Sequence, residues 1–143
     1  DAEAIWTWLT QTRGVPESNI ILYGKSLGGA SATELALRHK PRALVLQSTF
    51  TSIPEMAKRV IPWVPKFLVQ TQFDNLAKLP RITAPTLIIH SRADEIIPYA
   101  MSTANAKAAA NLSTHLSFDG YGHNYLVDGR GSEIIEAIAK LLD

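Results

Sequence analysis

The apolar run Asn19-Ile20-Ile21-Leu22-Tyr23 leads directly into Gly24-Lys25-Ser26-Leu27-Gly28. A continuous apolar run of this length is typical of a strand that is buried on both faces of a parallel sheet. The small residues after Leu27 favour a helix that packs closely on such a sheet. A Gly-x-Ser-x-Gly pattern between a strand and a helix is the pattern of a nucleophile elbow, a tight turn that holds its serine in a strained conformation. The sequence therefore predicts that Ser26 is a nucleophile at the end of a strand.

The composition limits the classes of function. With 143 residues, the chain is long enough for one domain with a sizeable core. A formal net charge of +1 gives no electrostatic reason to expect a nucleic-acid partner. The absence of cysteine excludes disulfides, thiol chemistry and cysteine-based zinc sites. We expect neither a metal nor any other cofactor.

Apolar periodicity predicts helices and strands that alternate along the chain. The expected helices cover 2–13, 27–39, 99–110 and the residues after an N-cap at Ser132, and the expected strands cover 19–23, 43–47, 86–90 and 114–118. The first helix is expected to present Ile5, Trp8, Leu9 and Thr12 on one face, and the last to bury Ile134, Ile135, Ile138, Leu141 and Leu142. Strands that alternate with helices predict an α/β fold, with a parallel sheet of about four strands flanked by helices.

A long connection, 51–84, separates the second and third strands. Its density of apolar residues argues against a solvated loop, and its four prolines predict two or three short helices. We interpret this segment as a small helical lid. The alternative is an ordinary crossover helix with an irregular approach.

A nucleophilic serine needs a histidine to accept its proton, and the carboxyl ends of parallel strands are where such partners gather. Among the four histidines, His39 ends a helix on the far side of the sheet, His90 ends a strand and His115 lies within one. His123 lies in a glycine-containing loop after the last strand, so its ring could reach over Ser26. We predict that His123 is the general base.

The acid that orients this histidine should follow the third strand, where Asp94 lies. Glu95 is the second choice for the acid, although a solvated charge or a helix-start anion also fits it. Asp119 ends its own strand and could orient the histidine loop. With Asp94 as acid, the order along the chain is nucleophile, acid, base, with Ser26 first and His123 last, which is the order in α/β-hydrolases.

Several segments resemble the α/β-hydrolase superfamily, and in particular small-lid bacterial hydrolases of the bud-emergence type and dienelactone-hydrolase-like enzymes. The segments that carry the resemblance are 23–30, 47–53, 90–98 and 120–124, together with the approach to the third strand over 73–75 and 82–86. The resemblance implies one partial α/β-hydrolase domain over 1–143, with the lid inserted at about 51–84. Family members place roughly four strands before the first helix of this chain, so the chain resembles the carboxyl-terminal part of a hydrolase.

Two consequences follow from that partial resemblance. The strand at 19–23 would have a bare edge, and an exposed apolar edge invites self-association. One backbone donor of the oxyanion hole, the Leu27 N–H, would remain while its companion from an early loop would be missing. Loss of one such donor lowers turnover by about a hundred- to a thousandfold. Targeting signals at an amino terminus would also be missing, so the compartment is not predicted beyond a cytoplasmic default, and membrane association stays open.

The resulting hypothesis is a serine hydrolase, specifically a carboxylesterase for small or medium acyl esters, which acts through Ser26, His123 and Asp94. Leu27 would contribute to the oxyanion hole. Trp63 and Phe67 in the lid would line the acyl site, although both could equally be core residues. The alternative is a non-catalytic fragment or interaction module that lacks part of the hydrolase fold. Amide, thioester and acyl-transfer chemistry use the same three groups and are not separated from ester hydrolysis by the sequence.

Overall fold

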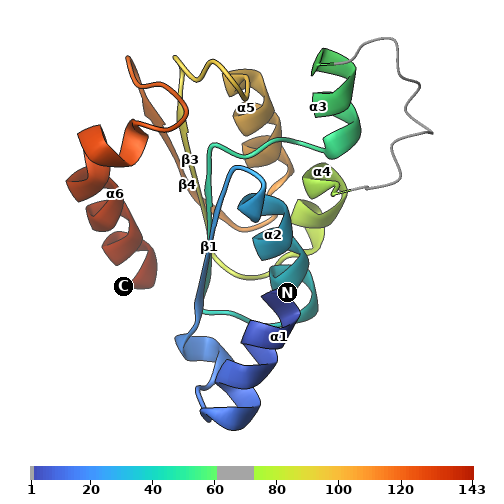
Figure 1. Ribbon diagram of the computed structural model, residues 1–143. Helices are drawn as coiled ribbons and strands as arrows, with labels where there is room; N and C mark the ends of the chain where they lie inside the picture. The colour runs from blue at the N-terminus through green and yellow to red at the C-terminus, as the bar shows by residue number, and fades with distance from the viewer. Residues whose placement is uncertain (1, 61–72) are drawn as a thin grey trace.

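The computed structural model describes residues 2–60 and 73–143, and in this part of the chain four parallel strands form one sheet (Figure 1). The strands are β1 (Ile21–Lys25), β2 (Ala43–Gln47), β3 (Thr86–Ser91) and β4 (Leu112–Phe118), and they lie side by side in the order β1-β2-β3-β4. Tyr23 pairs with Val45, Val45 with Leu87, and Leu87 with Thr114. The predicted α/β class, with a four-stranded parallel sheet, is confirmed.

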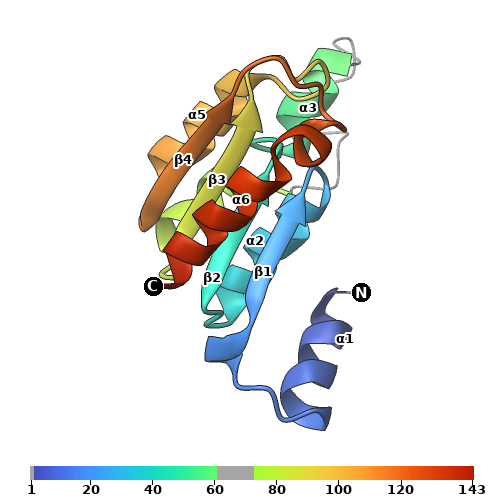
Figure 2. The same cartoon turned by 90° about the vertical axis from the view of Figure 1, so that its left-hand side faces the viewer.

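Helices cover both faces of this sheet (Figure 2). The helices are α1 (Ala2–Thr7), α2 (Gly28–Arg38), α3 (Ile53–Val60), α4 (Asn75–Lys78), α5 (Tyr99–Ala108) and α6 (Leu126–Leu142). Helices α2, α4 and α5 lie on one side of the strands and, among the helices of residues 2–60 and 73–143, α6 is the one on the other side, while α1 lies beside α2 (Figure 1). Because neighbouring strands are parallel, the carboxyl ends of β1, β3 and β4 lie at the same edge of the sheet.

The core follows the alternation of side chains along the central strands. Leu44 and Leu46 of β2 pack with Ile88 of β3 against the layer that contains α2 and α5. Val45 and Leu87 point to the opposite face, where they pack against α6. Successive side chains of a strand point to opposite faces, so the unbroken apolar run of β2 fills both halves of the core.

Strand β1 differs from the prediction in position and in burial. It covers Ile21–Lys25 rather than 19–23, because Asn19 ends a 3₁₀ turn, Glu17–Asn19. The prediction that this strand is buried on both faces is wrong, since Ile21 is 37% exposed and Tyr23 is 45% exposed. Within the described residues β1 is an edge strand with β2 as its one neighbour, so its outer side chains have no layer to cover them.

The first helix also presents a different face from the one expected. After Ala2–Thr7 the helix widens into a π-helical turn over Trp8–Thr12, which changes the angular positions of the side chains. Trp6, which precedes this turn, is the buried tryptophan and packs with Ile20 and Leu35, whereas Trp8 is 49% exposed. The expected inward face with Ile5 and Trp8 is wrong.

The last helix begins earlier than predicted. It starts at Leu126 and contains a kink at Arg130, so Ser132 lies inside the helix and is not its N-cap. Ile134 is buried, and Ile138 and Leu141 pack against the same core, as expected. Ile135, however, is 69% exposed, so the buried face of this helix passes through Ile134, Ile138 and Leu141 and not through Ile135.

The connection between β2 and β3 contains short helices where it is described, as its prolines predict. Helix α3, helix α4 and a 3₁₀ turn over Leu79–Arg81 lie in it. Trp63 and Phe67, the predicted acyl-site residues, lie outside the described residues, and the lid role of this segment stays a prediction. No helix among 2–60 and 73–143 is long and apolar enough to cross a membrane.

Candidate active site

Ser26 occupies the turn between β1 and α2, as the elbow pattern predicts. Its φ of 52° lies in the left-handed region, which is strained for a residue with a side chain. Two hydrogen bonds hold this conformation: the Ser26 N–H donates to the Gln47 carbonyl at 2.9 Å, and Thr49 Oγ1 donates to the Ser26 carbonyl at 2.7 Å. The strand next to β1 therefore fixes the backbone of the serine.

Close packing at the elbow requires Gly24, which belongs to the motif, and Gly29, which does not. A Cβ on Gly24 would lie 2.5 Å from Gly29 Cα, and a Cβ on Gly29 would lie 2.1 Å from Thr49 Oγ1. A Cβ on Gly28 would meet nothing within 4 Å among the described residues. Gly24 and Gly29 thus allow α2 to approach the sheet closely, whereas Gly28 has no steric role visible here.

Asp94 lies in the loop between β3 and α5, with a fully buried carboxylate. Its Oδ1 accepts the Ile96 N–H at 3.0 Å and the Ile97 N–H at 2.8 Å. Burial alone would raise the pKa of Asp94, but the hydrogen bonds from His90, Ile97, His123 and Ile96 outweigh it and hold this pKa well below its usual range. The carboxylate is therefore ionised at neutral pH.

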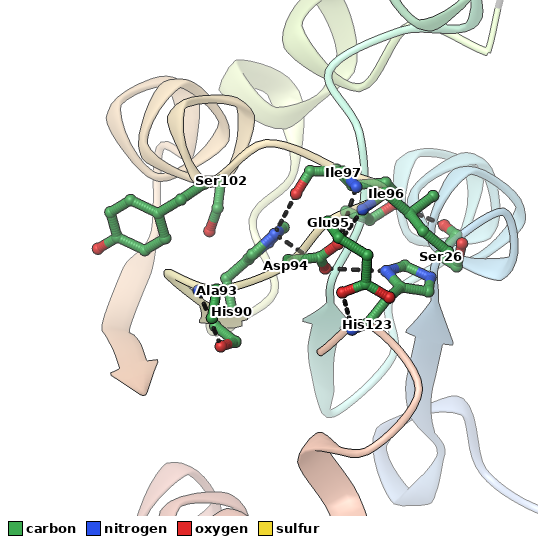
Figure 3. Close-up of polar contacts among 12 residues, drawn as sticks. Ser26, His90, Ala93, Asp94, Glu95, Ile96, Ile97, Ser102 and His123 are labelled. Carbon is green, nitrogen blue, oxygen red and sulfur yellow. Dashed lines mark hydrogen bonds and ion pairs between the residues drawn. The ribbon is translucent and has the colours of Figure 1, made fainter. Parts of the chain in front are cut away.

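His123 lies in the loop after β4 and contacts Asp94 directly. Its Nδ1 is 2.8 Å from Asp94 Oδ2, and its side chain is 5% exposed. An ionised carboxylate only accepts hydrogen bonds, so Nδ1 carries the proton and Nε2 of the neutral ring is left as a proton acceptor. Figure 3 shows the His123 ring between Asp94 and Ser26. No hydrogen bond of Ser26 Oγ is present in the described part of the chain.

Glu95 holds the same histidine through its backbone, a contact that sequence reasoning missed. The His123 N–H donates to Glu95 Oε2 at 3.0 Å (Figure 3). The carboxylate of Glu95 also lies so close to Gly122 that a Cβ there would be 2.9 Å from Oε2. Glu95 is thus not the acid that orients the ring; it is exposed to solvent, and its carboxylate also accepts the His123 N–H. No sequence signal separates these roles, because they depend on how two loops fold toward each other.

The remaining histidines have other partners. His90 is buried beside Asp94, with Nε2 3.3 Å from Asp94 Oδ2. His115 Nε2 lies 2.8 Å from Ser102 Oγ, and burial, followed by nearby His90 and Arg92, lowers the pKa of His115. His39 bonds Glu3 at the other end of the sheet.

Leu27 precedes the first residue of α2, with its side chain 59% exposed. Its backbone N–H has no hydrogen-bond acceptor within 2–60 and 73–143, and an open N–H at a helix start can bind a developing negative charge. The same ranges contain no cluster of three or more metal-binding side chains. The site thus combines a serine hydroxyl on a strained backbone, an imidazole whose Nε2 can accept a proton, a buried carboxylate and a backbone N–H without an acceptor among the described residues.

Comparisons with known proteins relate the chain to hydrolases. An uncharacterized protein of Mycobacterium tuberculosis is 35% identical over 99% of this chain and 51% of its own length. The human α/β hydrolase domain-containing protein 17B is 34% identical over 87% of this chain and 42% of its own length. This chain therefore spans about half the length of the curated relatives that it matches. No protein-family model matches it.

Solved structures share the fold at low sequence identity. The crystal structure of an α/β hydrolase enzyme from a sediment metagenome of the Mar Chica lagoon, Morocco, has a TM-score of 0.73 and 20% identity. The match covers 97% of this chain and 68% of that enzyme. At this identity the likeness concerns the fold alone.

Proposed function

We propose that this chain, which is similar in sequence and fold to α/β hydrolases, carries the site of a serine hydrolase formed by Ser26, His123 and Asp94. The observation that supports this most strongly is the 2.8 Å hydrogen bond between His123 Nδ1 and Asp94 Oδ2, next to a strained serine elbow. A carboxylate that fixes the tautomer of a histidine leaves its Nε2 free to accept a proton from a nucleophile.

In the proposed reaction, Ser26 Oγ attacks the carbonyl carbon of an ester while His123 Nε2 takes the hydroxyl proton. Asp94 stabilises the imidazolium that forms, and the Leu27 N–H donates to the negative oxygen of the tetrahedral intermediate. Collapse of this intermediate breaks the ester bond, and the leaving alkoxide takes the proton from His123. Water then attacks the acyl-serine with His123 as the base, which releases the acid and restores Ser26.

We further propose carboxylic esters of small or medium acyl groups as the substrates. This finer step rests on the elbow and on the apolar connection after β2, whose expected acyl-site residues Trp63 and Phe67 lie outside the described residues. Of that connection, Ile53, Met56 and Phe73 pack against Ala30 of α2 and Ile97 of the acid loop. An apolar wall thus begins next to the serine elbow.

A fluorophosphonate probe, which phosphonylates activated serines, tests the proposal. We expect the full chain to be labelled, Ser26→Ala to lose labelling completely, and the exposed control Ser18→Ala to keep it. Hydrolysis of p-nitrophenyl esters from acetate to decanoate then measures the preferred acyl length. Folded wild-type protein that shows no labelling at any pH between 6 and 9 would overturn the serine-hydrolase proposal.

The second candidate function is a non-catalytic module, which the open edge of β1 favours. Ile21 and Tyr23 are exposed on that edge, next to a groove lined in part by Ile5 and Leu9 of the first helical segment. A second copy of the chain could pair there. This candidate predicts folded protein that associates with itself and does not react with the probe.

A further inference from the structure

His90 is a buried histidine that the proposed reaction does not use. It lies in β3, four residues before Asp94, and its side chain is 1% exposed. Its Nε2 is 2.9 Å from the Ile97 carbonyl oxygen and 3.3 Å from Asp94 Oδ2. Figure 3 shows its ring edge directed at the acid loop, on the side of Asp94 away from Ser26.

The partners of His90 assign its tautomer. A carbonyl oxygen only accepts hydrogen bonds, so Nε2 carries the proton. This N–H points at the Ile97 carbonyl and is also close to Asp94 Oδ2. The opposite ring atom, Nδ1, is buried and has no hydrogen-bond partner in the described part of the chain. The polar contacts of the ring are therefore concentrated on one short loop.

The Nδ1 atom, unpartnered among the described residues, is a cost that an apolar side chain at this position would not carry. A buried ring nitrogen without a partner is unfavourable, whereas a phenylalanine ring would leave no such atom. Packing alone thus does not account for a histidine here, whereas the N–H that it directs at the Ile97 carbonyl and Asp94 Oδ2 does. The oxygen that it approaches, Oδ2, is the same one that accepts His123 Nδ1–H.

We propose that His90 is a positioning residue, which fixes the orientation of the Asp94 carboxylate so that Oδ2 stays directed at His123. Ile96 and Ile97 hold Oδ1 from one side, and His90 holds Oδ2 from a second direction. Hydrogen bonds at both oxygens of a carboxylate restrain its rotation about the last torsion. His123 then has one bonding position, with Nε2 turned to the serine. The inference rests on the proposed function for its catalytic consequence, although the geometry of the Asp94–His123 pair can be measured without activity.

Two substitutions of His90 test the shape of its ring and its N–H donor independently. His90→Gln keeps a side-chain N–H at about the distance of Nε2 and loses the ring, whereas His90→Phe keeps the ring shape and loses the donor. The first readout is the proton NMR signal of the His123 Nδ1–H, which a hydrogen bond to a carboxylate moves far downfield. The second is the rate of fluorophosphonate labelling of Ser26.

We expect His90→Phe to lose the downfield signal and to be labelled about tenfold more slowly, since a hydrogen bond to a charged group is worth roughly that factor or more. His90→Gln should keep the signal and label within about threefold of wild type. The control His115→Phe removes a histidine that bonds Ser102 and not Asp94, so it should keep the downfield signal and the wild-type labelling rate. If His90→Phe does not fold, His90→Asn takes its place, because its amide is too short to reach Oδ2.

A folded donor-free variant with the wild-type signal and labelling rate would overturn the inference. So would a His90→Gln protein that matches His90→Phe in both. Failure of the proposed function is a separate result: wild type would show the downfield signal and no labelling, and the signal alone would then decide the role of His90.

Discussion

The two halves of the candidate site are built differently. Asp94 and His123 lie in loops at the ends of β3 and β4, are almost fully buried, and are held by several hydrogen bonds. Ser26 and Leu27 lie at the end of β1, an edge strand in the described sheet, with a strained backbone and an open N–H. The hydrogen bonds that hold the acid–base half thus come from this chain. The nucleophile half instead lies at the end of a strand whose outer edge has no neighbouring strand among the described residues.

The largest expected effect comes from the acid–base half. Asp94→Asn keeps the shape of the side chain but allows its amide to donate to His123, which favours the wrong tautomer of the ring. We expect labelling of Ser26 by a fluorophosphonate to slow by about ten-thousandfold. The rate is measured by gel fluorescence over a series of probe concentrations.

Asp119→Asn is the matched control, because that carboxylate is exposed and pairs with Arg92 at 3.2 Å. It should label at the wild-type rate. An Asp94→Asn protein that labels within tenfold of wild type would show that the acid–base half does not activate Ser26.

The nucleophile half should respond most strongly at Gly24. An added Cβ would meet the backbone of Gly29 at 2.5 Å, so Gly24→Ala must push α2 away from the sheet. Overpacking of this kind costs about 1–3 kcal/mol, which corresponds to a fall in Tm of roughly 3–10 °C. Thermal unfolding followed by circular dichroism measures the change.

Gly28→Ala is the control within the same motif, since its Cβ would meet nothing among the described residues. The substitution should leave Tm unchanged or raise it slightly, because alanine favours helix over glycine by about 1 kcal/mol. Equal losses of Tm in the two variants would contradict the assignment of close packing to Gly24.

The elements with strong local signals could be predicted from the sequence, and those set by neighbouring elements could not. The bounds of β2 agree with 43–47, because a short apolar run between helices has one reasonable interpretation. The kink at Arg130 and the π-helical turn at Trp8–Thr12 have no comparable signal in the sequence. The exposed face of β1 depends on which strands are its neighbours, and a run of apolar residues does not reveal that.

The candidate site shows the same division. Ser26, Asp94 and His123 could be named because each follows a strand, and parallel strands bring their carboxyl ends to one edge. The parts played by Glu95 and His90 could not, because a side chain that accepts a backbone N–H or approaches a carboxylate leaves no spacing pattern. Strand order predicts which residues meet, but it does not predict how they are oriented.

A smaller effect is expected at Glu95, which tethers the His123 loop. Glu95→Ala removes the acceptor of the His123 N–H, so the loop should sample more positions and labelling should slow about tenfold. Glu95→Gln keeps an acceptor oxygen and should stay within about threefold of wild type. Equal slowing in both variants would instead assign the effect to the lost negative charge.

The acid–base half should also make stability depend on acid pH. Since the folded state lowers the pKa of Asp94, this carboxylate stabilises the protein at pH values above the ordinary aspartate range and loses that contribution as the pH falls through it. Urea unfolding of wild type and Asp94→Asn should therefore differ most near pH 7, with the difference shrinking from about pH 4 downward. His90, His123 and Glu95 also face this site, so the same comparison in Asp119→Asn, expected to be flat, isolates Asp94. A difference that does not change with pH would contradict the pairing.

The smallest expected effect separates the two edges of the sheet. On the β1 edge Ile21 is 37% exposed and Ile5 of α1 is 61% exposed, whereas β4 presents exposed polar residues such as Ser113 and Thr114. An apolar edge favours pairing with another strand, and a lysine placed there opposes it through the cost of burying its charge.

Ile21→Lys should therefore weaken any self-association of the chain by about three- to tenfold in a sedimentation-velocity concentration series, while Ser113→Lys should leave it unchanged. Equal weakening by both lysines would mean that net charge, and not the β1 edge, governs association. A wild-type chain that stays monomeric at high concentration would show that the open side of the nucleophile half does not recruit a second copy.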